Sequence, residues 1–155
     1  PVVYWSESGR TRSNLDFFER LGPRAAALGI EDIRFSFAQW YRKSVRRARA
    51  AGFAFFDPPV EEKRVAASRL AERAGSLGLI LYACSQDVLS GVDGVKPSAC
   101  IDGARLKELH PCREAASRVK DPTQRTECRC TRSVDIGSYA QACLHACLYC
   151  YARTG

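Results

Sequence analysis

The chain has 155 residues, which suits one compact domain with a sizeable core. Its hydrophobic content of 46% and charged content of 26% are ordinary for a globular protein and exclude a disordered chain. No apolar run approaches the roughly 18 residues of a transmembrane helix, and the first ten residues lack the basic-then-apolar order of a signal peptide. We therefore expect no membrane partner and no secretion.

The net charge of +7 comes mainly from arginines in segments such as YRKSVRRARA, residues 41–50. Such residues commonly form solvated helix faces. They also attract phosphate groups, as in nucleic acids or nucleotides. The solvated face is the favoured interpretation, and the charge pattern does not choose between DNA, RNA and a small phosphorylated ligand.

In the first part of the chain, short apolar segments alternate with amphipathic ones. Helix 14–28 is predicted because Leu15, Phe18 and Leu21 fall on one face, and Pro23 is expected to kink or split it. Helix 60–77 is predicted because Pro58 and its neighbours open it. In chain order we expect strand 1–5, helix 14–28, strand 33–37, helix 41–50, helix 60–77 and strand 79–83.

This order of strands and helices favours parallel α/β packing. Three strands do not close a barrel. The expected fold class is therefore α/β, either a partial (β/α) barrel or a small parallel sheet, with a cysteine-rich irregular C-terminal tail. The α/β segment spans residues 1–84, and the tail, residues 85–155, packs on it as one domain. Turn signals dominate the tail, in which only 105–109 suggests a short helix.

Eight cysteines are many for this length. Without a signal peptide, clustered thiols more often bind metal than form disulfides. A disulfide-stapled secreted protein remains an alternative. The cysteines are Cys84, Cys100, Cys112, Cys128, Cys130, Cys143, Cys147 and Cys150.

The last three cysteines stand in CLHACLYC, at C-x3-C-x2-C spacing. Thiolates are soft ligands that suit zinc and iron–sulfur clusters. A structural zinc ion needs four ligands. Three thiolates on a 4Fe–4S cluster leave one iron open to a substrate or cofactor.

This motif resembles the C-x3-C-x-aromatic-C signature of the radical S-adenosylmethionine superfamily, carried here by Cys143, Cys147, Tyr149 and Cys150. The resemblance implies a 4Fe–4S cluster on the three cysteines, whose open iron binds S-adenosylmethionine, with Tyr149 near the adenine. It further implies reductive cleavage to a radical that abstracts hydrogen from an unknown substrate, and an electron donor such as a flavodoxin or ferredoxin. A cluster of this kind needs reduced thiols and little oxygen, so we expect a cytoplasmic location.

In that superfamily the signature follows the first barrel strand, whereas here five residues follow Cys150. The terminal position resembles an uncharacterised bacterial domain-of-unknown-function family with such a cluster at its C-terminus. The stretches LYACSQD around Cys84, SACIDG around Cys100, and 124–139 are similar to that family, so the resemblance covers most of residues 79–152 and, more loosely, the α/β segment before them. We expect the chain to correspond to the C-terminal half of such a protein, with CLHAC in place of the more usual Cys-Pro-His-Gly-Cys.

Four further cysteines, Cys84, Cys100, Cys128 and Cys130, are candidates for a second metal site that holds another iron–sulfur cluster or zinc. Alternatively, Cys84 and Cys100 are buried small hydrophobic residues. Cys112 lacks a matching partner and is expected to be a free thiol.

The second functional hypothesis is a structural zinc module with a basic nucleic-acid-binding surface. The uneven spacing speaks against it, because a zinc ribbon shows two matched knuckles. The sequence contains no G-x-G-x-x-G, P-loop, G-x-S-x-G or H-E-x-x-H motif, so dinucleotide, P-loop, hydrolase and zinc-protease functions receive no support.

Overall fold

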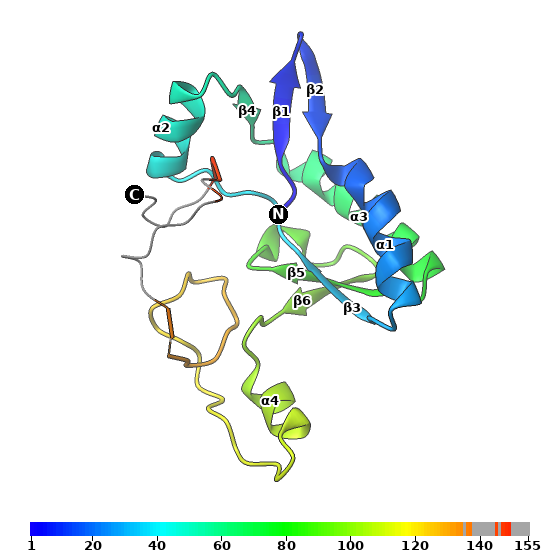
Figure 1. The fold of residues 1–155 in the computed structure, drawn as a ribbon, viewed down its shortest axis with the longest axis vertical. Coiled ribbons are helices and arrows are strands. Elements are labelled where there is room, and N and C mark those ends of the chain that lie inside the picture. The colour runs from blue at the N-terminus through cyan, green and yellow to red at the C-terminus, as the bar shows by residue number, and fades with distance from the viewer. Residues whose placement is uncertain (135, 138–144, 146, 150–155) are drawn as a thin grey trace.

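The computed structural model describes residues 1–134, 136–137, 145 and 147–149. Two small sheets and four helices make up its regular structure (Figure 1). The strands are β1 (Tyr4–Glu7), β2 (Arg10–Ser13), β3 (Asp32–Phe35), β4 (Phe55–Phe56), β5 (Ile80–Cys84) and β6 (Val95–Ser98). The helices are α1 (Phe18–Ala27), α2 (Arg42–Ala50), α3 (Val60–Ser76) and α4 (Gly103–Leu109), with 3₁₀ turns at Leu15–Phe17 and Asp87–Leu89.

The central feature is a parallel sheet with strand order β3-β5-β6. This confirms the predicted α/β class, as a small parallel sheet; the described residues form no closed barrel. Along β5, Leu81 and Ala83 are buried, whereas Tyr82 and Cys84 on the other face are half-buried. The expectation that the apolar run 79–83 is a strand is therefore confirmed, but only one of its faces is fully covered.

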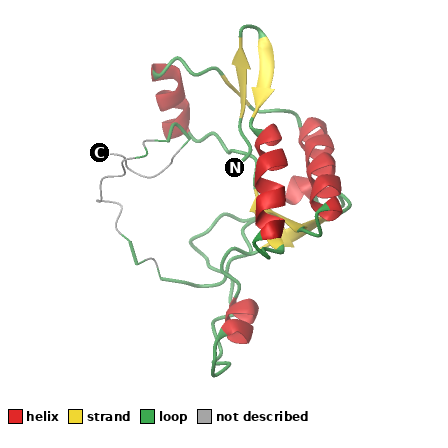
Figure 2. Cartoon of the chain, turned by 45° about the vertical axis from the view of Figure 1, so that its right-hand side comes forward, coloured by secondary structure: helices red, strands yellow, loops and turns green. Residues whose placement is uncertain are grey.

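Helices α1 and α3 lie side by side over the parallel sheet (Figures 1 and 2). The predicted helix 60–77 is confirmed as α3, which follows directly after Pro58 and Pro59. Its apolar residue Leu70 and its small residues Ala67 and Ala74 belong to the same buried core as β5. Small side chains let the helix approach the sheet closely, so the core forms here.

Helix α1 runs through Pro23 without being split, so the expected break at this residue is wrong. Proline removes only one intrahelical hydrogen bond. The preceding residue is Gly22, which has no Cβ to clash with the proline ring. A Cβ on Gly22 would also lie 2.8 Å from Leu77 Cδ1, so glycine lets α1 pack closely against the end of α3.

The N-terminal segment differs most from expectation. Strand β1 begins at Tyr4 and belongs to an antiparallel sheet of order β2-β1-β4. Val2 makes only an isolated parallel bridge, to Phe37 beyond β3. Between β1 and β2, Ser8 and Gly9 both have positive φ angles, +50° and +75°, as the two-residue turn of a tight hairpin requires.

Helix α4 and the tail that follows it bury far fewer side chains than the rest of the described residues. The predicted short helix 105–109 is confirmed as α4, whose first turn is capped by the Asp102 carboxylate, an acceptor for the N–H groups of Ala104 and Arg105. Between residues 104 and 134, only Asp121, Cys128 and Cys130 are buried. Across the described part of the chain, no helix is both long enough and apolar enough to span a membrane.

Leu81→Ala should destabilise the protein strongly, because Leu81 is 1% exposed at the centre of the core. Large-to-small substitutions of this kind cost about 2–5 kcal/mol. Urea unfolding measures the loss. Leu109→Ala is the matched control, since Leu109 is 69% exposed and should change stability by about 0.5 kcal/mol or less. Equal losses for the two variants would contradict the assigned core.

Candidate metal centre

Two of the predicted ligands meet where parallel strands end. Strands β5 and β6 are paired so that Cys84 lies opposite Ser98, and Cys100 follows two residues later. Because the strands are parallel, their carboxyl ends share one edge of the sheet. Cys84 Sγ lies 3.3 Å from Cys100 Sγ, and both are free thiols.

The tail brings the C-x-C pair to the same edge. Thr131 N–H donates to the Ile101 carbonyl oxygen at 2.9 Å, and Ile101 N–H donates to Cys130 Sγ at 3.4 Å. These bonds hold the tail against the residue that follows Cys100. Both Cys128 and Cys130 are buried and unpaired by disulfides.

The four thiols interact electrostatically. Burial, followed by the hydrogen bond and charge of Cys100 and then the charges of Cys128 and Cys130, raises the pKa of Cys84 to about 12. Burial is also the main cause that raises the pKa of Cys128, while the backbone N–H of Cys130 acts in the opposite direction. As free thiols, Cys84 and Cys128 therefore stay protonated at neutral pH.

Within the described ranges, no three His, Cys, Asp or Glu side chains are already arranged around one metal position. The four predicted ligands of the second site thus lie as two pairs, Cys84 with Cys100 and Cys128 with Cys130. Its metal binding stays a prediction.

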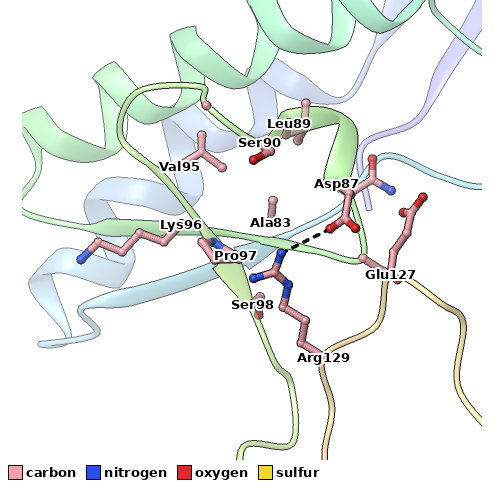
Figure 3. A pocket seen from close by; sticks show the side chains of 13 residues that line it. Ala83, Asp87, Leu89, Ser90, Val95, Lys96, Pro97, Ser98, Glu127 and Arg129 are labelled. Carbon is pink, nitrogen blue, oxygen red and sulfur yellow. Dashed lines mark ion pairs between the residues drawn. The ribbon is translucent and has the colours of Figure 1, made fainter. Parts of the chain in front are cut away.

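A small cavity of about 170 Å³ lies beside these pairs, between the carboxyl ends of β5 and β6 and the tail (Figure 3). Arg129 of the tail forms an ion pair with Asp87 at 3.5 Å across it. The hydroxyls of Ser85 and Ser98, which line the cavity, are buried without a hydrogen-bond partner among the described residues. Ser85 also has φ +52°, an uncommon conformation for a residue other than glycine.

A larger groove of about 900 Å³ lies beyond the carboxyl end of β3. Its wall combines the segment after β3, the start of α2, three tail residues and Tyr149 of the cysteine motif. Arg125 donates a hydrogen bond to Gln39 Oε1, and Tyr41 Oη donates to the same oxygen at 3.0 Å. The polar and aromatic residues that line the groove include Gln39, Tyr41, Arg42, Lys43, Arg125 and Tyr149.

The structure describes only part of the predicted three-thiolate motif. Cys147 is a half-buried free thiol, and Tyr149 lines the groove. Cys143 and Cys150 lie outside the described residues, so the complete ligand set stays a prediction. The expected free thiol Cys112 is exposed and free.

The sequence of the chain matches one protein family, Domain of unknown function (DUF1848), over residues 1–152. The chain belongs to this family. No curated protein and no solved structure matches it. The match confirms the expected relation to a family of unknown function, including the looser resemblance of the α/β segment. The radical-SAM-type link of this DUF1848 protein stays a prediction.

Sequence reasoning missed the groove and the cavity. Gln39 and Lys43 belong to one segment, and Arg125 belongs to another, 86 positions beyond Gln39. One usable signal was available for the first two, because residues just beyond the carboxyl end of a parallel strand commonly bind ligands. Arg125 lies in the stretch 124–139 that resembles the family, but nothing in the sequence indicates that it meets Gln39.

Alkylation should separate the cysteines by environment. Cys112 is exposed, whereas Cys84 and Cys128 are partly or fully buried with raised pKa values, so their thiols are rarely in the reactive thiolate form. Iodoacetamide at neutral pH should label Cys112 before Cys84 and Cys128, as peptide mass spectrometry can follow. Labelling of Cys84 as fast as Cys112 in folded protein would contradict the assigned environment; denatured protein is the control in which the difference should vanish.

Gly103→Ala should loosen the tail, because a Cβ there would lie 1.8 Å from the Ser117 carbonyl oxygen. Relieving such overlap typically costs about 1–3 kcal/mol. We expect faster proteolysis of residues 110–134 and a lower Tm. Gly75→Ala, on α3 with no atom within 4 Å of the added carbon, is the matched control and should be neutral or slightly stabilising. Unchanged proteolysis in Gly103→Ala would refute the close contact.

Proposed function

We propose that this DUF1848 protein is an iron–sulfur protein of the radical S-adenosylmethionine type. In this proposal Cys143, Cys147 and Cys150 hold a 4Fe–4S cluster whose fourth iron binds the cofactor. The observation that supports it best is the position of Tyr149, which belongs to the cysteine motif and lines the groove beyond β3.

The groove has the size and place of a ligand site. Its volume of about 900 Å³ lies at the upper end of the range for small-molecule pockets, about 300–1,000 Å³. In sheets of parallel strands, ligands bind beyond the carboxyl ends of the strands. Strand β3 ends at Phe35, and the groove begins with the residues that follow it.

The groove lining suits a ligand that has both a planar ring and an anionic group. Tyr41 and Tyr149 offer aromatic surface for an adenine ring, and Lys43 and Arg125 offer positive charge for a carboxylate. Arg125 is already oriented by its hydrogen bond to Gln39. Less of its side-chain entropy would therefore be lost when a ligand binds.

Each residue then has a defined part. Cys147, a half-buried free thiol near the groove residue Tyr149, fits the role of a cluster ligand. Tyr149 would flank the adenine, while Arg125 and Lys43 would fix the carboxylate. The bound cluster and cofactor together would supply one-electron reductive chemistry. That chemistry needs reduced thiols and an electron donor such as a flavodoxin or ferredoxin, so the location we propose is the cytoplasm.

A zinc module that binds nucleic acid is the alternative, and helix α2 favours it. Its sequence RKSVRRARA contains five basic residues and no acidic one. Arg42 and Lys43 at its start also line the groove. A helix of this charge would attract phosphate, with strong salt dependence. Zinc without iron in the native protein would favour this alternative.

Anaerobic reconstitution with iron and sulfide tests the proposal. We expect the native chain to take up about four irons and to give a reduced-cluster EPR signal that shifts when S-adenosylmethionine is added. Cys147→Ala should lose both, because one cluster ligand is removed. Cys112→Ala is the matched control and should keep both, since Cys112 is exposed and outside the motif.

Tyr149→Ala refines the same experiment. It should keep the iron but weaken the cofactor-dependent shift by about tenfold in cofactor concentration, which is within the worth of one stacked base. Iron uptake that is unchanged in Cys147→Ala, or native protein that takes up zinc and no iron, would overturn the proposal.

A further inference from the structure

We propose that Cys84, Cys100, Cys128 and Cys130 form a closed four-thiolate site for a single tetrahedral zinc ion, separate from the cysteine motif at residues 143–150. Its role would be structural: it would join the tail to the carboxyl-end edge of the parallel sheet. The proposal goes beyond the proposed iron–sulfur function and does not depend on it.

Three separate segments of the chain bring the four cysteines to one edge of the parallel sheet. Cys84 ends β5, Cys100 follows β6, and the tail supplies Cys128 and Cys130. Hydrogen bonds between Ile101 and the tail residues Cys130 and Thr131 bring the segments together. Residues up to 46 positions apart in sequence thus carry their thiols to one edge.

The distance between the sulfurs of Cys84 and Cys100 fits ligands of a single zinc ion. Cys84 Sγ and Cys100 Sγ lie 3.3 Å apart. A tetrahedral zinc ion with Zn–S bonds of about 2.3 Å places its sulfurs about 3.8 Å from one another. In a 4Fe–4S cluster each thiolate binds a different iron, so its sulfurs stand farther apart. The close pair therefore favours a single ion over a second cluster.

Backbone N–H groups interact with the sulfurs of Cys128 and Cys130. Ile101 N–H donates to Cys130 Sγ at 3.4 Å, and the backbone N–H of Cys130 interacts with the Cys128 sulfur. Donors of this kind orient thiolate ligands and stabilise their negative charge. Neither donor is needed by a thiol that serves only as a small apolar side chain.

The tail buries few side chains, and two of them are cysteines of the proposed site. Between residues 104 and 134, the buried residues are Asp121, Cys128 and Cys130, so this stretch has no apolar core of its own. Where burial is this small, a metal that ties distant ligands together can supply the missing order. The buried cysteines stand where such a tie would be effective.

The local charge also suits a zinc–thiolate group. One zinc ion with four thiolates carries a net charge of −2. The positive charge of Arg125 acts on the Cys128 thiol, and Arg129 lies between Cys128 and Cys130 in the sequence. In this structure the two thiol pairs do not surround one position, so the proposal requires them to close on the ion as it binds.

Metal analysis of a variant without the C-terminal motif tests the proposal. In Cys143→Ala/Cys147→Ala/Cys150→Ala, purified under reducing conditions, we expect one zinc per chain by mass spectrometry and four Zn–S contacts at about 2.3 Å by X-ray absorption. Replacement of zinc by Co²⁺ should give intense sulfur-to-cobalt bands. Adding Cys128→Ser/Cys130→Ser should abolish zinc and bands, whereas adding Cys112→Ser should preserve both.

Several outcomes would overturn the proposal. They are a triple variant that holds no zinc, one that takes up about four irons instead, or a Cys84–Cys100 disulfide in the reduced preparation. If the serine variant fails to fold, the cobalt spectrum of the triple variant still decides the ligand type. Failure of the native chain to take up iron would refute only the proposed cluster, since the zinc content of the triple variant is measured separately.

Discussion

The pairing of β5 with β6 is the constraint on which the candidate sites depend. Because the two strands are parallel and Cys84 lies opposite Ser98, Cys84 and Cys100 leave the sheet at one edge. The same edge forms one wall of the small cavity and receives the tail. An antiparallel pairing would send the chain after β6 to the opposite edge, and the thiols would not meet.

The sheet and the tail are stabilised in different ways. Helices α1 and α3 cover the sheet, and burial of the hydrophobic core of Phe18, Leu70, Leu81 and their neighbours stabilises this part of the protein. The tail, by contrast, is held by backbone hydrogen bonds and the close contact of Gly103 with Ser117. In our proposal a zinc ion on the four thiols adds to these contacts. The folded tail is therefore expected to be the part whose stability responds most to metal and redox conditions.

Much of the core could be predicted from the sequence because its signals are local. The prolines before α3 and its apolar stripe identify that helix, and the apolar run 79–83 identifies β5. Strand β6 was missed because VKPS contains a proline, which is tolerated here since β6 is an edge strand. The β1–β2 hairpin was missed because β2 is polar, although Ser8-Gly9 is a turn signal.

The candidate metal residues could be named from their type, but their grouping could not be derived. Whether Cys128 and Cys130 reach Cys84 depends on the path of the tail, which tertiary contacts such as Thr131 with Ile101 determine. The groove beside Tyr149 likewise combines segments that only the fold brings together. Local patterns thus predicted the chemistry of the side chains, and long-range packing decided which of them meet.

Anomalous scattering from crystals of the full chain, grown without oxygen after reconstitution, tests the two proposed metal sites most directly. The account predicts a peak at the zinc edge among Cys84, Cys100, Cys128 and Cys130. It also predicts a separate peak at the iron edge beside Cys147, near the groove lined by Tyr149. A single metal site shared by all these cysteines, or disulfides in place of metal, would contradict it.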